Sequence, residues 1–267
     1  MRRTFFNEFL YQIFALIIAV IVVHTVYVTT IRPRAAEILA EQALRIEQEE
    51  NYTPDRPIVV LIRDFEQEAC FVLMLWAFAI MGFKAYTAIN ERSLLQRDIL
   101  PVRDGVRILP DDTREYGRLL QSLPEKQQPM LMPRVMLAAL ERFGSTRNVQ
   151  DVSSVANTLF EGESERLESE LSMIRYIAWA IPSVGFIGTV RGIGQALGEA
   201  HRAVEGDIAG VTENLGVAFN STLVALLISI VVMFLVHQLQ LLQERLVFDT
   251  QTHVDHNLIR HMQARGS

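Results

Sequence analysis

The stretch "IPSVGFIGTVRGIGQALG", Ile181 to Gly198, is apolar enough to span a membrane, yet it contains five glycines, a proline, a threonine and an arginine. Glycine weakens a helix in water, and arginine is costly in lipid. On a helix with 100° per residue, the small residues of this stretch gather in one sector. They are Gly185, Gly188, Thr189, Gly192 and Ala196. Such a face lets a second helix approach closely, either from the same chain or from another subunit.

Four long stretches of the chain carry almost no charge. They are residues 9–31, 69–90, 176–198 and 214–243. Each reaches the roughly 20 apolar residues that a helix needs to cross a bilayer. The hydrophobic content of 50% and the mean hydropathy of +0.20 point the same way. We therefore expect an all-α, polytopic membrane protein with four transmembrane helices and a helical cytoplasmic segment between helices two and three.

The distribution of charge predicts the topology. Arginines precede the first stretch and follow the second, whereas the connection 199–213 carries four acidic residues against one arginine. The positive-inside rule then places both termini in the cytoplasm, although Arg32 and Arg34 oppose this orientation. The predicted division is an N-terminus with the first span (1–31), an outer loop (32–68), the second span (69–90), a helical cytoplasmic domain (91–174), the third span (175–198), a short outer loop (199–213), the fourth span (214–243) and an amphipathic cytoplasmic tail (244–267).

Helix signals mark the segments outside the spans. Asp111 or Asp112 is expected to cap one helix of the middle segment, and Pro133 and Gly144 to begin and end another. From Val149, helical periodicity predicts one long helix that runs into the third span. The first outer loop is expected to start as a helix, whereas residues 58–62 are compatible with an interfacial segment or a short strand.

The fourth span has a small-residue face of its own. Its members are Ala218, Thr222, Ala225 and Ser229. Thr189 lies about nine residues from the outer end of the third span and Thr222 about eight residues into the fourth, which runs the other way. The two threonines are therefore predicted at the same depth, where they would line a narrow polar passage.

Charged residues within the spans are scarce. Arg191 lies near the outer mouth, where we expect a structural role; its side chain would snorkel outward or pair with an acid such as Glu199 or one from a partner. None of the four apolar stretches contains Asp or Glu. If this chain conducts protons, a partner must supply the acid, because proton relays in membranes use carboxylates or histidines.

Several functional classes are disfavoured. The net charge of −6 argues against nucleic-acid binding, and the single Cys70 forms no internal disulfide. No nucleophile–base pair, phosphate loop or metal-ligand cluster is evident, since His253 and His256 have HxxH spacing without a third ligand. We expect neither an enzyme nor a bound cofactor or metal.

Two motifs resemble one family. "IPSVGFIGTVRGI" (Ile181 to Ile193) is similar to the signature "AP-x-x-G-L-x-G-T-V-x-G-I" of the MotA/TolQ/ExbB proton-channel family, and "LGVAFNSTLVALLISI" (Leu215 to Ile230) to its "GI-x-x-AL-x-x-T-x-x-GL" segment. Two positions depart from the family pattern. Arg191 stands where the TolQ and ExbB branch often has Trp, and Val231 stands near a position that is proline in the family.

The resemblance implies a bacterial inner-membrane motor complex. Five copies would surround two copies of a single-span partner of the MotB/TolR/ExbD type, whose aspartate takes up protons. Proton flow would drive rotary work, and the glycine face would let the pentamer close around the partner helices. The resemblance assigns Thr189 and Thr222 to the proton path and Pro182 to the start of the pore helix. The alternatives are a non-conducting membrane scaffold of the same fold and a monomeric small-solute transporter.

Overall fold

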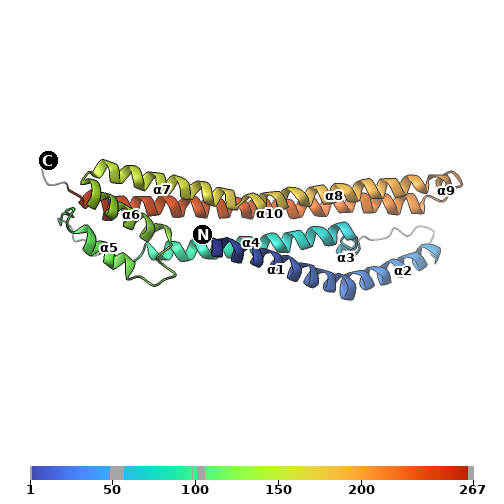
Figure 1. The fold of residues 1–267 in the computed structure, drawn as a ribbon. Coiled ribbons are helices and arrows are strands. Elements are labelled where there is room, and N and C mark those ends of the chain that lie inside the picture. Colours follow the sequence, from blue (N-terminus) through green and yellow to red (C-terminus); the bar gives the residue numbers. More distant parts are fainter. Residues whose placement is uncertain (1, 49–56, 98, 101–105, 264–267) are drawn as a thin grey trace. The chain divides into compact units, whose positions relative to one another are not determined.

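A computed structural model describes residues 2–48, 57–97, 99–100 and 106–263, and within them the chain is helical with no β-strand (Figure 1). The helices are α1 (Arg2–Val26), a π-helical segment (Tyr27–Ile31), α2 (Arg32–Gln48), α3 (Ile58–Leu61), α4 (Phe65–Leu94), α5 (Thr113–Gln121), α6 (Leu131–Thr146), α7 (Val149–Glu170), α8 (Ser172–Gly198), α9 (Ala200–Val204), α10 (Ala209–Asn257) and a 3-10 turn (Ile259–His261). Four helical segments are long and apolar enough to cross a membrane, which confirms the predicted fold class.

The chain divides into two compact units. Unit 1 comprises Met1–Gly82 and Met173–Val236, and unit 2 comprises Phe83–Ser172 and His237–Ser267. Unit 1 contains α1 to α3, the first part of α4, nearly all of α8, and α9 with the first part of α10. Unit 2 contains α5 to α7 and the remaining parts of α4 and α10.

In unit 1 the first predicted span continues into the first outer loop without a break. The π-helical segment Tyr27–Ile31 joins α1 to α2, and the backbone N–H of Arg32 donates to the carbonyl of Tyr27. Pro33 follows directly and has no N–H to donate to the carbonyl four residues earlier, so the regular α-helical pattern cannot be kept here. The expected helix at the start of the loop is confirmed as α2. Residues 58–61 form a single helical turn, α3, and not a strand.

The helix that carries the second span begins at Phe65, four residues before the predicted start of the span. The backbone N–H of Asp64 donates to the side-chain carbonyl of Gln67 over 2.8 Å, which satisfies one backbone donor at the start of this helix. Three polar residues, Glu66 to Glu68, consequently lie in the first turn of α4.

Unit 2 has a core of bulky apolar side chains from α5, α6, α7 and the end of α10. Its fully buried members include Leu120, Met136, Leu140, Phe143, Val152, Val254 and Leu258. Val254 and Leu258 belong to the predicted amphipathic tail, and both are buried in this core. Helix α7 begins at Val149 as expected, with Asn148 as its cap, because the Asn148 side chain accepts a hydrogen bond from the backbone N–H of Gln150.

One predicted helix end in the middle segment is wrong. Helix α6 does not end at Gly144 but continues to Thr146, and Arg147 then adopts a left-handed conformation with φ of 55°. Gly144 serves packing instead, because a Cβ there would lie 2.8 Å from Thr113 Oγ1. The long helix expected from Val149 into the third span is found as the helical segment Val149–Gly198, in which a single residue, Leu171, separates α7 from α8.

Candidate ion-pathway site

In unit 1, the glycine face of α8 packs directly against the small-residue face of α10 from the same chain (Figure 1). A Cβ at Gly185 would overlap that of Ala225, and one at Gly192 would lie 2.8 Å from the backbone nitrogen of Ala218. Distances this short leave no room for any side chain but hydrogen. Of the two alternatives that the sequence left open, a second helix of the same chain is the one that occupies this face at Gly185, Gly188 and Gly192.

Pro182 and Ser229 form a second contact between these helices. Pro182 lies inside α8 and has no N–H, so the carbonyl of Ala178, four residues earlier, loses its helical partner. Ala178 is buried, but the Ser229 hydroxyl on α10 donates to this carbonyl over 3.2 Å. The serine thereby compensates for the hydrogen bond that the proline removes.

Thr189 and Thr222 lie in direct contact between the two helices. Their hydroxyl oxygens form a hydrogen bond with each other. Thr189 Oγ1 also lies 3.1 Å from the carbonyl of Ala218, and Thr222 Oγ1 lies 3.2 Å from that of Gly185. The two threonines, which the sequence predicts at the same depth, are thus brought together. Chemically, this pair can exchange donor and acceptor roles, but neutral hydroxyls cannot store a proton at ordinary pH.

The first turn of α4 contacts three other parts of unit 1. We call its residues Glu66, Gln67 and Glu68 the polar collar. Gln67 is fully buried, and its amide nitrogen donates to the hydroxyl of Ser221 on α10 over 3.4 Å. Sequence reasoning missed the collar because the apolar stretch begins at Ala69, whereas capping starts the helix earlier.

Arg191 pairs with the first residue of the collar. Its Nε lies 2.7 Å from Oε1 of Glu66, and its second terminal nitrogen lies 2.8 Å from Oε2, so the pair is bidentate. Glu66 is largely buried, with 11% of its side chain exposed, against 37% for Arg191. Arg191, for which a structural role near the outer mouth is predicted, thus has an acidic partner within the chain. Glu199, the acid named from the sequence, instead pairs with Arg202 at 3.1 Å.

The last residue of the collar faces a different set of helices. Glu68 forms an ion pair with Arg32 at the start of α2 and a hydrogen bond of 2.7 Å with His24 on α1. Glu66 and Glu68 are two positions apart on a helix, so their side chains leave it in widely different directions. The collar therefore ties α4 to α8 on one side and to α1 and α2 on another.

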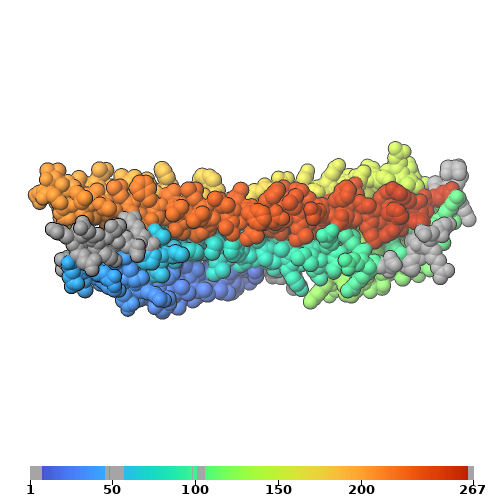
Figure 2. All heavy atoms as spheres, turned by 180° about the vertical axis from the view of Figure 1, so that it is seen from behind, coloured from blue at the N-terminus to red at the C-terminus, as the bar shows by residue number. Residues whose placement is uncertain are grey.

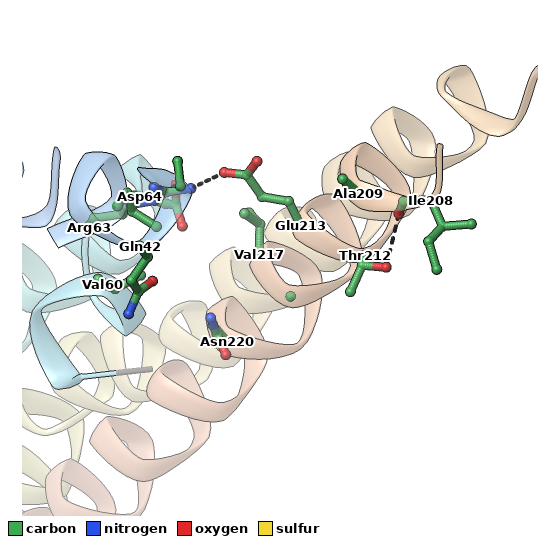
Figure 3. Close-up of a pocket in the computed structure, with 13 residues that line it drawn as sticks. Gln42, Val60, Arg63, Asp64, Ile208, Ala209, Thr212, Glu213, Val217 and Asn220 are labelled. Carbon is green, nitrogen blue, oxygen red and sulfur yellow. Dashed lines mark hydrogen bonds and ion pairs between the residues drawn. The ribbon is translucent and has the colours of Figure 1, made fainter. Parts of the chain in front are cut away.

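A cavity of about 710 Å³ lies in unit 1 near the start of α10 (Figure 3). Residues of α2, of α3 with the segment that follows it, and of α10 line it, and the Arg63–Glu213 ion pair at 2.8 Å connects two of these elements. Burial raises the pKa of Asp64 above its ordinary value, and the nearby Arg63 opposes the shift.

Large apolar side chains cover the outward faces of α8 and α10 in unit 1. Phe186, Ile187 and Val190 on α8 are each at least 60% exposed, and so are Phe219 and Ile230 on α10. The space-filling view shows that one face of α10 is open along its length (Figure 2). In a membrane protein, such faces meet lipid or the helices of neighbouring subunits.

Comparison with known proteins supports the resemblance seen in the motifs. Residues 127–252, just under half of the chain, match the model of the MotA/TolQ/ExbB proton channel family. This segment contains all of α8 and most of α10, and hence both threonines, whereas the polar collar lies outside it. Searches of curated proteins and of solved structures yield no match. The four apolar helices make the chain a multi-pass membrane protein, and its segment 127–252 is similar to the MotA/TolQ/ExbB proton channel family.

Proposed function

We propose that this chain is the proton-conducting subunit of a motor complex. Five copies surround two copies of a single-span partner of the MotB/TolR/ExbD type and convert the proton motive force into rotary work across the cell envelope. The observation that carries the proposal is the hydroxyl contact between Thr189 and Thr222. It joins α8 and α10 within residues 127–252, called here the family segment, and a proton path requires groups that both donate and accept.

The need for a partner follows from the residues around the two threonines. Helix α8 contains no acidic residue, and α10 contains none between Glu213 and Glu244. Hydroxyls relay but do not hold protons, and both carboxylate oxygens of Glu66 on α4 are held by Arg191, so a carboxylate that takes up protons must come from elsewhere. An aspartate on the transmembrane helix of a second protein meets this need. Neither a cofactor nor nucleic acid enters the proposal.

The pentamer rests on different surfaces from those first expected. The glycine face of α8 is filled within the chain, so contacts between subunits and with the partner fall to the exposed apolar faces of α8 and α10. We propose the bacterial inner membrane as its location, as the family resemblance implies, with both termini in the cytoplasm, an orientation that the distribution of charge favours.

Proton flux through the native complex tests this function. The full chain is purified with its partner in mild detergent, weighed by native mass spectrometry and reconstituted into vesicles that contain a pH-sensitive dye. We expect a mass that includes five copies of the chain. Thr222→Val and Thr189→Val should each reduce flux to background while the assembly persists, because each removes one hydroxyl of the pair.

Thr25→Val is the matched control. Thr25 is exposed on α1, and its hydroxyl donates only to the carbonyl of Ile21 in its own helix, over 2.7 Å. This variant should conduct like the wild type. Full flux in both pore variants, or a chain that remains monomeric with its partner present, would contradict the proposal.

A non-conducting scaffold is the second candidate. It is favoured by the cross-helix hydrogen bonds of both threonines, because such bonds also hold two helices together without any transport. A scaffold would form the same pentamer but show no flux even as the wild type. Loss of both threonine hydroxyls would then lower its thermal stability and change no transport signal.

A further inference from the structure

The Arg191–Glu66 pair places one positive and one negative charge close to the proposed path. Arg191 follows Thr189 by two positions on α8 and leaves the helix on another side, where Glu66 binds it from α4 with both carboxylate oxygens. The link to the path is Glu66 itself, which lies against Gly188, the residue before Thr189. Arginine keeps its charge in proteins at all relevant pH values. Without Glu66, a full positive charge would therefore remain near the entrance that a proton must use.

Gly188 explains how Glu66 comes so close to the two pore helices. The point where a Cβ of Gly188 would lie is 3.1 Å from Cγ of Glu66 and 2.7 Å from the hydroxyl oxygen of Ser221. Ser221 directly precedes Thr222 and is fully buried. Because this glycine lacks a side chain, the carboxylate side chain and the serine hydroxyl both reach one small space beside the threonine pair.

We propose that Glu66 is a positioning residue of the ion path, which holds the Arg191 guanidinium toward α4 and cancels its charge so that protons can approach Thr189 and Thr222. The inference rests on the proposed function and goes beyond it, since it adds a residue outside the family segment. In a partly buried site, an uncompensated cation repels another cation far more strongly than it does in water.

The electrostatic role predicts an order of activities that a merely structural pair does not. Glu66→Gln leaves Arg191 uncompensated and should lower proton flux by about tenfold. Arg191→Gln removes the repelling charge and should conduct at least as well as the wild type. The double variant carries neither charge and should recover flux to within about threefold of the wild type. A pair that acted only as a fastener would make all three variants similarly defective.

Glu68→Gln provides the matched control. It makes the same chemical change in the same helical turn, but its partners are Arg32 and His24 on the other side of α4. This variant should retain wild-type flux if the effect comes from the potential at the path. All variants are measured as full complexes in vesicles with a pH-sensitive dye, after native mass spectrometry has established their assembly.

Each outcome decides the inference. Wild-type flux in Glu66→Gln, or a double variant as inactive as Glu66→Gln, would overturn it. If Glu66→Gln fails to assemble, Arg191→Gln decides alone, because a tenfold loss there contradicts the proposed repulsion. Loss of flux in Thr222→Val together with normal flux in Glu66→Gln would reject this inference and leave the proposed function intact. Normal flux in Thr222→Val would reject the proposed function itself.

Discussion

Unit 1 and unit 2 differ in the size of the side chains at their helix contacts. In unit 1, α8 from Gly185 onward meets α10 through glycine, alanine, serine and threonine, and large side chains such as Phe186 and Phe219 point outward. In unit 2, Leu140, Phe143 and their neighbours are fully buried. In lipid there is no hydrophobic drive between helices, so close contact and hydrogen bonds hold them together, whereas in water the burial of bulky apolar groups dominates. The two units should therefore respond differently to changes in side-chain size.

The largest effect is expected from adding volume in unit 1. Gly185→Leu would force a side chain into the space occupied by Ala225 and next to the carbonyl of Ser221, 3.1 Å away. Because backbone blocks the site, the cost should reach at least about 3 kcal/mol. We expect no folded chain in mild detergent, measured by recovery from size-exclusion chromatography. In contrast, Gly194→Leu on the same helix should be recovered normally, because nothing lies within 4 Å of its Cβ position.

Removing volume is the corresponding test for unit 2. Phe143→Ala should destabilise this unit by about 3–5 kcal/mol, through lost burial and a residual cavity. Hydrogen exchange on the full-length protein should show faster exchange in α6 and α7 and little change in α8. Phe248→Ala is the control. The Phe248 side chain is 68% exposed, so its removal should change hydrogen exchange only slightly. Equally faster hydrogen exchange in α8 would contradict this prediction.

The two kinds of helix contact also show which features of the fold could be predicted from the sequence. Span length, absence of charge and helical spacing depend on local sequence, so four helices and the alignment of Thr189 with Thr222 could be predicted. Periodicity defines a face but does not identify what covers it, so the occupant of the α8 glycines remained open. The structure shows that α10 covers them. The predicted helix end at Gly144 was wrong for the same reason. This glycine serves a tertiary contact with Thr113, which the local sequence does not indicate.

The polar collar marks a second limit of the sequence. A window of apolar residues finds the interior of a span and not its first turn, which capping by Gln67 determines here. The pairing of Glu66 with Arg191 joins residues that are 125 positions apart. No local pattern indicates such a contact. Both features decide the charge near the candidate path, so the least predictable part of the site carries its electrostatics.

The smallest predicted effect concerns the contact between Ser229 and Pro182. Ser229→Ala would leave the buried carbonyl of Ala178 without a partner and should cost about 1–2 kcal/mol, visible as a lower melting temperature in detergent. Pro182→Ala restores a backbone N–H to that carbonyl. In the double variant, the loss of the serine hydroxyl should then cost almost nothing, and the two changes should couple by about 1 kcal/mol.

A cycle without coupling would show that Ser229 does not compensate for the proline. Thr212→Val is a suitable reference. The exposed Thr212 hydroxyl donates to the carbonyl of Ile208 in the preceding turn, and water can replace this hydrogen bond when the hydroxyl is removed. Strong coupling would mean that unit 1 tolerates a proline within a span because a side chain from the next helix supplies the missing donor. The same principle, in which a neighbouring helix completes what one helix lacks, accounts for the glycine contacts and for the Arg191–Glu66 pair.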